Sequence, residues 1–207
     1  MNTTRRSLVL LATAALGVVA VVACAPPSRG AGPAPASTTA RDTALDQGMR
    51  TIVRLASERV KTADVVAAAK WGTRQPIDDP DREQAVLDGV TAQAAKRGVD
   101  EAAVRRIFED QIAANKAVQV ALHAQWQARP AERPTHRLDL ATQVRPVLDR
   151  VDGQLLTAIQ QVQHLLSAPG CEVALSREIA AAARAQGLDA LHRSGLDQAL
   201  AHTCAPR

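Results

Sequence analysis

The sequence predicts an all-α protein, and three observations support this fold class. Aromatic residues make up 1% of the chain and Tyr is absent, and runs of β-branched and aromatic residues, which are typical of strands, are missing. Alanine dominates the apolar content. Apolar residues recur at steps of three and four, which indicates amphipathic helices. With 207 residues, 46% of them hydrophobic, the chain is long enough for one domain with a real core.

Residues 1–24 are expected to be an export signal and not part of the fold. Arg5 and Arg6 form a charged start, compatible with the twin-arginine type, and the apolar run at 8–22 is too short for a comfortable membrane span. The run ends in Val-Val-Ala-Cys24, which resembles the lipobox of bacterial lipoproteins. We therefore expect Cys24 to carry lipid and to anchor an exported protein, periplasmic or extracellular, to the outer face of the membrane. The alternative is ordinary cleavage near Cys24 and a freely secreted protein.

Residues 25–42 are rich in Pro, Ala, Ser, Thr and Gly, a composition typical of a disordered linker. The folded domain is then expected to span 43–207. We expect a single domain of six helices, in which the long helices form a bundle around an internal site. The predicted helix ranges are 45–71, 80–97, 101–128, 142–167, 171–186 and 188–204.

The first helix carries two cations on its apolar side. It contains one glycine and no proline, and the positions that its spacing turns inward are Leu45, Met49, Ile52, Ala56, Arg59, Ala63, Val66 and Lys70. Arg59 and Lys70 are close to three turns apart, so they point the same way, roughly 16 Å apart along the axis. An unpaired buried cation costs several kcal/mol. Either each cation pairs with a carboxylate or reaches the rim, or the two hold an anion.

Capping signals bound the next two helices. Asp79 and Pro80 suit an N-cap and a first turn, and Gly98 suits a C-terminal end. Asp100 caps the third helix, and two prolines within 129–134 end it. The third helix repeats the oddity of the first, because its inward face includes two amides that need hydrogen-bond partners. That face consists of Ile112, Asn115, Gln119, Leu122 and Trp126.

The last three helices follow from proline, glycine and cysteine positions. Pro146 is tolerated only in the first turn of the fourth helix, and Gly187 separates the last two helices. If Cys24 carries lipid, Cys171 and Cys204 remain as an even pair in an oxidising compartment, so we expect them to form a disulfide that ties the C-terminal helices. On the chain-entropy model the bridge would stabilise the fold by roughly 3–4 kcal/mol. The alternative is two free thiols.

The polar inward positions predict a pocket for a small polyanion. Arginine supplies bidentate pairing with carboxylates, and one acid in the set could accept from a hydroxyl. The expected lining is Arg59, Lys70, Arg82, Glu83, Asn115, Gln119 and Arg145. Such a pocket suits a reaction that needs only positioning and electrostatics.

The sequence lacks the motifs of several other kinds of catalysis and binding. The chain has no Ser-His-Asp arrangement, no glycine-rich phosphate loop and no HExxH, and its five histidines lack metal-ligand spacing. We expect no metal and no cofactor. The formal net charge of +4 is not concentrated in a basic run, so nucleic acid is not an expected partner.

Four segments resemble the secreted subclass of all-α chorismate mutases. They are ERVKTADVVAAAKW, PIDDPDREQAVL, VRRIFEDQIAANKAVQ, and LSAPGC with a later cysteine. The similarity runs from about residue 43 to 204. The resemblance implies a cofactor-free isomerase that converts chorismate to prephenate, and a homodimer in which each chain holds a complete active site.

The resemblance also implies which residues bind the carboxylates of chorismate. Arg59 and Arg145 would clamp the two carboxylates, with Arg82 assisting. Asn115 stands where a Ser or Thr hydroxyl is usual, and its amide could still donate to a carboxylate. Val86 occupies the place of a usual glutamine, so one polar contact would be missing.

The resemblance also implies roles for residues around the C–O bond of chorismate that breaks in the reaction. The resemblance implies that Lys70 and Gln119 donate to the ether oxygen from opposite sides, and that Glu83 accepts from the ring hydroxyl. Gln119 replaces the carboxylate that is usual in the secreted subclass. Since an amide donates at any pH, we predict little loss of activity between about pH 5 and 8. Lys116 replaces an acid beside the pocket and is expected to be a solvated surface lysine.

Two rival hypotheses keep the same residues without catalysis. The first is an exported binding module that captures an anionic dicarboxylate metabolite in the same pocket. The second is a structural lipoprotein in which the inward cations are merely paired to carboxylates. The second predicts that Lys70→Ala changes stability more than any response to a ligand.

Overall fold

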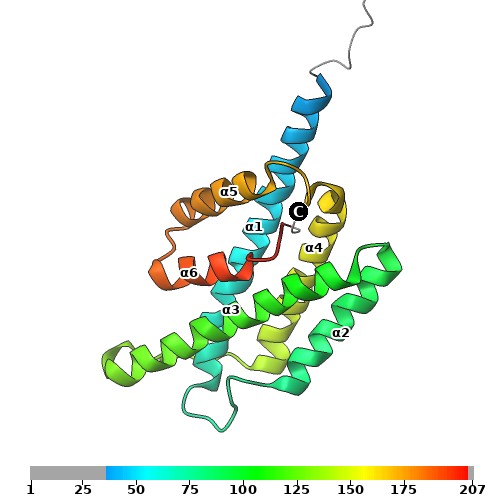
Figure 1. The fold of residues 1–207 in the computed structure, drawn as a ribbon. Coiled ribbons are helices and arrows are strands. Elements are labelled where there is room, and N and C mark those ends of the chain that lie inside the picture. Colours follow the sequence, from blue (N-terminus) through cyan, green and yellow to red (C-terminus); the bar gives the residue numbers. More distant parts are fainter. Residues whose placement is uncertain (1–35, 205–207) are drawn as a thin grey trace, which may run out of the picture. The chain divides into compact units, whose positions relative to one another are not determined.

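The computed structural model describes residues 36–204, and this part of the chain is all-α, as predicted (Figure 1). The α-helices are α1 (Ala36–Lys70), α2 (Pro80–Arg97), α3 (Glu101–Ala128), α4 (Arg145–Val162), α5 (Cys171–Ala185) and α6 (Ala190–Ala199). The expected export signal and the lipid site at Cys24 lie outside the described residues. No helix in 36–204 combines the length and the apolar character that a membrane crossing needs.

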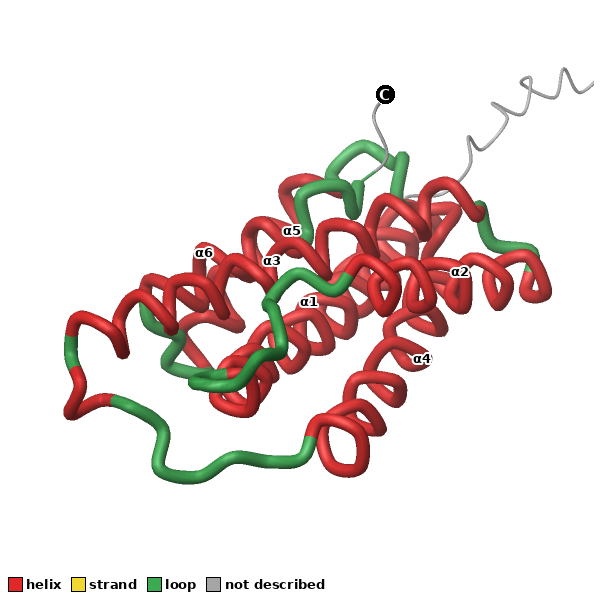
Figure 2. The backbone as a smooth tube through the Cα atoms, turned by 90° about the horizontal axis from the view of Figure 1, so that it is seen from below, coloured by secondary structure: helices red, strands yellow, loops and turns green. Residues whose placement is uncertain are grey.

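Helix α1 is the element on which the others pack. It contacts α3, α4, α5 and α6, while α2 packs mainly on α3 (Figure 1). A long connection joins α3 to α4, as Figure 2 shows. It contains a turn of 3₁₀-helix at Pro130–Glu132 and leads into a π-helical turn at Leu140–Val144 directly before α4.

The inward seam predicted for α1 is confirmed. Seven of its eight positions are buried and Lys70 is partly buried. The helix begins at Ala36, earlier than expected, so it takes in the last residues of the segment that was expected to be a linker. Its one glycine within the predicted range is explained by packing, because a Cβ at Gly48 would clash with the side chain of Val162.

The predicted bounds of α2 and α3 are confirmed. The carboxylate of Asp79 accepts from the backbone N–H of Arg82, and that of Asp100 accepts from Ala103 N–H. Gly98 ends α2 with φ at 66°, a left-handed conformation that glycine adopts at little cost.

The later helices are shorter than predicted. Helix α4 gives way at Gln163–Leu165 to a 3₁₀ turn, before the expected end at 167. Helix α6 begins at Ala190 because Asp189 caps it by accepting from His192 N–H. The predicted disulfide between Cys171 and Cys204 is present, and turns after Ala199 bring Cys204 to the start of α5.

A change of character divides α1 into two halves. From Leu45 to Ala56 the inward side belongs to the main apolar core, together with residues such as Phe108 of α3, Leu155 of α4 and Cys171 of α5; we call this the apolar half. From position 57 onward, buried polar side chains interrupt the packing, and we call this the polar half. The buried polar set around it is Ser57, Arg59, Thr62, Gln111, Asn115, Gln119 and Asp152.

Candidate active site

A cavity of about 190 Å³ lies beside the polar half of α1. Residues of α1, α2, α3, α4 and the π-helical turn before α4 line it, together with the loop between α1 and α2. All of the residues predicted for the anion pocket are among the lining residues: Arg59, Lys70, Arg82, Glu83, Asn115, Gln119 and Arg145. The cations and amides of the sequence therefore converge on one hollow.

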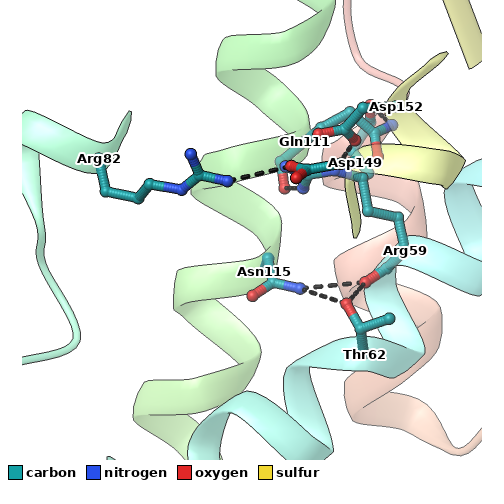
Figure 3. A network of polar contacts seen from close by, with 8 residues as sticks. Arg59, Thr62, Arg82, Gln111, Asn115, Asp149 and Asp152 are labelled. Carbon is teal, nitrogen blue, oxygen red and sulfur yellow. Dashed lines mark hydrogen bonds and ion pairs between the residues drawn. The ribbon is translucent and has the colours of Figure 1, made fainter. Parts of the chain in front are cut away.

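Arg59 is held from two sides (Figure 3). Its Nε donates to Asp152 Oδ1 at 2.7 Å, and its Nη1 donates to the backbone oxygen of Gln111 at 2.8 Å. Arg59 is 5% exposed and Asp152 is 6% exposed. A guanidinium has five N–H donors, so two are used for orientation and the others remain for a ligand.

Asp152 is a site residue that the sequence interpretation missed. A signal was available, because Asp152 follows Arg145 by about two helical turns and therefore lies on the same face of α4. The carboxylate matches one buried cation, so the interpretation that inward cations pair with internal acids is correct for Arg59.

Lys70 has no carboxylate within ion-pair distance among the residues that the structure describes. Its Nζ donates to the backbone oxygen of Ile77 at 3.0 Å. Burial lowers the pKa of Lys70 below its ordinary value, and Asp79 and Glu83 nearby oppose this shift while Arg145 adds to it. A partly desolvated cation of this kind gains from the arrival of an anion.

Arg82 and Arg145 lie nearer to solvent. Arg82 Nη2 forms an ion pair with Asp149 Oδ1 at 3.0 Å (Figure 3). Both side chains are well exposed, at 37% and 63%, and exposed pairs of this kind contribute little. The Arg145 side chain is exposed and has no hydrogen bond or ion pair within residues 36–204. Both guanidinium groups are therefore available to a ligand at low cost.

Glu83 is held at the first turn of α2. Its Oε1 accepts from the backbone N–H of Asp79 at 3.2 Å, and its Oε2 accepts from Lys116 Nζ at 3.0 Å. Lys116, predicted to be a solvated surface lysine, is partly exposed, and its ammonium also pairs with the exposed Asp78 at 2.9 Å. The hydrogen bond to Asp78, with help from Glu83, raises the pKa of Lys116 despite some burial. Lys116 thus ties α3 to the loop before α2.

Asn115 and Gln119 lie one turn apart on α3 and are hydrogen-bonded to each other. Asn115 Nδ2 donates to the backbone oxygen of Arg59 at 3.0 Å and to Thr62 Oγ1 at 3.3 Å. Gln119 Nε2 donates to Asn115 Oδ1 at 2.8 Å. The oxygen of Gln119 is buried and has no partner within the described part of the chain.

The arrangement can bind a small dianion and can place two neutral or positive donors on it. It offers no general base next to a nucleophile, so positioning and electrostatics are the chemistry that these side chains support. Val86 lines the cavity as an apolar side chain, at the position where a polar contact was expected to be missing.

Comparison with known proteins identifies relatives over most of the chain. Residues 44–120 match the family described as Chorismate mutase type II. The secreted chorismate mutase of Mycolicibacterium smegmatis is 35% identical over 74% of this chain and 84% of the relative, and that of Mycobacterium tuberculosis is 33% identical over 74% and 76%. The crystal structure of a chorismate mutase from Burkholderia thailandensis superposes with a TM-score of 0.73 at 42% identity, covering 76% of this chain and 99% of that one.

Proposed function

The chain belongs to the secreted chorismate mutases and is an intramolecular isomerase; from this premise we propose that the cavity beside α1 is where chorismate becomes prephenate. The proposal rests on one observation: every residue predicted for the anion pocket lines the same cavity. The reaction is a Claisen rearrangement of one substrate, so no nucleophile, metal or cofactor takes part in it.

The carboxylates of chorismate are assigned to the arginines. Arg59, oriented by Asp152, presents its remaining N–H groups to one carboxylate, and Arg145 binds the other. Arg82 assists after leaving its exposed pair with Asp149. Holding both carboxylates selects the compact chair-like conformer in which the two reacting carbons meet, so part of the barrier is removed in binding.

The developing negative charge is assigned to Lys70 and Gln119. As the C–O bond breaks, charge grows on the ether oxygen, and a donor already in place there stabilises the transition state more than the ground state. One such donor contributes about 3–4 kcal/mol. Glu83 accepts from the ring hydroxyl, and its ion pair with Lys116 keeps the carboxylate in place.

Export, lipid attachment and dimer formation complete the proposal. Export is supported by the charged and apolar start of the chain and by the relatives whose names describe them as secreted. Lipid at Cys24 rests on the Val-Val-Ala-Cys24 sequence alone, and mass spectrometry of the native N-terminus tests it. The homodimer is carried over from the resemblance, and sedimentation of the purified protein tests it.

A chorismate assay tests the activity. Purified protein is incubated with chorismate, and the loss of chorismate absorbance is followed for the wild type, Lys70→Ala and Lys61→Ala. Lys61 is the matched control, because it is an exposed lysine of the same helix that does not line the cavity. We expect conversion by the wild type and Lys61→Ala and loss of it in Lys70→Ala. Saturable binding of chorismate without conversion would favour an exported binding module instead.

A further inference from the structure

We propose that Asn115 is a positioning residue that sets the direction of the Gln119 amide. This inference rests on the proposed function, in which Gln119 donates to the ether oxygen. It gives Asn115 a role beyond the expected donation to a carboxylate of chorismate.

The amide nitrogen of Asn115 faces two neighbouring oxygens of α1. These are the backbone oxygen of Arg59 at 3.0 Å and Thr62 Oγ1 at 3.3 Å (Figure 3). The Thr62 hydroxyl donates its own hydrogen to the same Arg59 oxygen at 2.6 Å, so its oxygen is free to accept. Asn115 is 8% exposed. The amide nitrogen of Asn115 is therefore held against α1.

The orientation of Asn115 is dictated by the backbone of α1. A backbone carbonyl can only accept, so the amide nitrogen of Asn115 must face Arg59 O. Turning the amide over would bring two oxygens together at that contact. The Asn115 oxygen is consequently directed away from α1, and it accepts from Gln119 Nε2 at 2.8 Å.

The orientation of the Asn115 amide in turn fixes the orientation of the Gln119 amide. Because Asn115 offers an oxygen, the nitrogen of Gln119 must face it, and the Gln119 oxygen is left buried without a partner in the described residues. Gln119 is 3% exposed and lines the cavity. Without Asn115, nothing would prevent the amide from turning over and presenting its oxygen, an acceptor, where a donor is needed.

The contacts from Arg59 O through Asn115 to Gln119, which we call the relay, leave Gln119 one free N–H. An amide nitrogen carries two hydrogens, and Asn115 uses one of them. The remaining N–H is the group assigned to the ether oxygen. Arg59 thus serves the site twice: its side chain holds a carboxylate, and its backbone oxygen starts the chain of contacts that fixes a donor.

Gln125 supplies an internal control on the same helix. Its Nε2 donates to Glu132 Oε2 at 2.6 Å, far from the contacts of Asn115. It does not line the cavity. Replacing it should leave kcat unchanged, whereas replacing Asn115 should lower kcat.

A double-mutant cycle tests the relay. We measure kcat and KM for chorismate in the wild type, Asn115→Ala, Gln119→Ala and the double variant. Gln119→Ala should lower kcat by on the order of 10²–10³-fold. Asn115→Ala should lower kcat by about 10- to 100-fold, as expected for a misplaced catalytic group. In the Gln119→Ala background, Asn115→Ala should lower kcat no further, because interacting residues are not additive.

Controls separate positioning from folding. Asn115→Leu restores volume without hydrogen bonds and should lose kcat as Asn115→Ala does, while Gln125→Leu should keep kcat; thermal unfolding by circular dichroism checks each variant. The relay is overturned if the losses in kcat simply multiply, or if Asn115→Leu retains wild-type kcat. An inactive wild type would instead remove the proposed function, and with it the relay.

Discussion

The apolar and polar halves of α1 have the same helical spacing of inward residues, but those residues serve different purposes. In the apolar half, Met49 and Ile52 are fully buried among leucines and valines of α4 and α5. In the polar half, Arg59 takes the next inward position and faces a cavity, while a second apolar cluster that includes Val60, Ala63 and Trp126 is buried there as well. Both halves therefore pack apolar side chains, but only the polar half also holds a buried charge beside a cavity. Substitutions in the two halves should therefore separate stability from turnover.

The largest effect is expected at Asp152, where the two halves meet. Asp152→Ala leaves the Arg59 guanidinium buried without its partner, and breaking a buried pair in this way costs about 3–5 kcal/mol. We expect a loss of that size in the free energy of unfolding, measured with urea, together with a raised KM. Asp149→Ala is the matched control, because its pair with Arg82 is exposed. An unchanged unfolding midpoint in Asp152→Ala would contradict the stabilising role.

The next effect concerns the apolar half alone. Replacing Cys171 and Cys204 by serine removes the disulfide, which on the chain-entropy model contributes roughly 3–4 kcal/mol. Both cysteines belong to the main apolar core and neither lines the cavity. Thermal unfolding should shift downward while kcat and KM of the folded protein stay the same. A selective loss of kcat in the double serine variant would show that the two halves are coupled.

A comparable effect, on turnover instead of stability, is expected at Lys70. Lys70→Ala should lower kcat/KM by on the order of 10²–10³-fold, and urea unfolding should change little because the ammonium is only partly buried. The alternative, a merely structural lysine, predicts the reverse: a lower unfolding midpoint and no change in the response to chorismate.

The smallest effect is expected from pH. The Gln119 amide does not titrate, so kcat/KM should vary by less than about twofold between pH 5 and 8. Because burial lowers the pKa of Lys70, its ammonium loses its proton at a lower pH than an ordinary lysine does, and activity should fall on the alkaline side first. Gln119→Glu should instead be active only on the acid side, since a carboxyl group donates only when it is protonated. A sharp acid optimum in the wild type would contradict the role of Gln119.

Much of the fold follows from local sequence signals. The bounds of α2 and α3 were predictable because Asp79, Asp100 and Gly98 act through neighbouring backbone groups. The start of α6 also has a local signal, the cap at Asp189, which the sequence interpretation missed. The end of α4 was not predictable, since a 3₁₀ turn there depends on contacts between distant segments.

The candidate site was predictable as a set but not as a network. Helical spacing and the resemblance together brought out the residues that line the cavity. Which atom faces which group depends on helix packing: the partners of Arg59 and Lys116, and the direction of the Asn115 amide, all involve side chains or backbone from other helices. Spacing within one helix can place Asp152 on the same face as Arg145, but it does not say which atoms of two helices meet.

The arginines of the cavity are graded from exposed Arg145, through Arg82 with its exposed carboxylate partner, to buried Arg59. A dianion that approaches from solvent meets the most exposed positive charge first, and such attraction accelerates encounter. At about 0.1–0.15 M salt, mobile ions screen the interaction between exposed charges over a distance of about 8–10 Å, but they screen buried charges much less. Added sodium chloride should therefore slow the capture of chorismate while leaving the rate of its rearrangement, once it is enclosed, nearly unchanged.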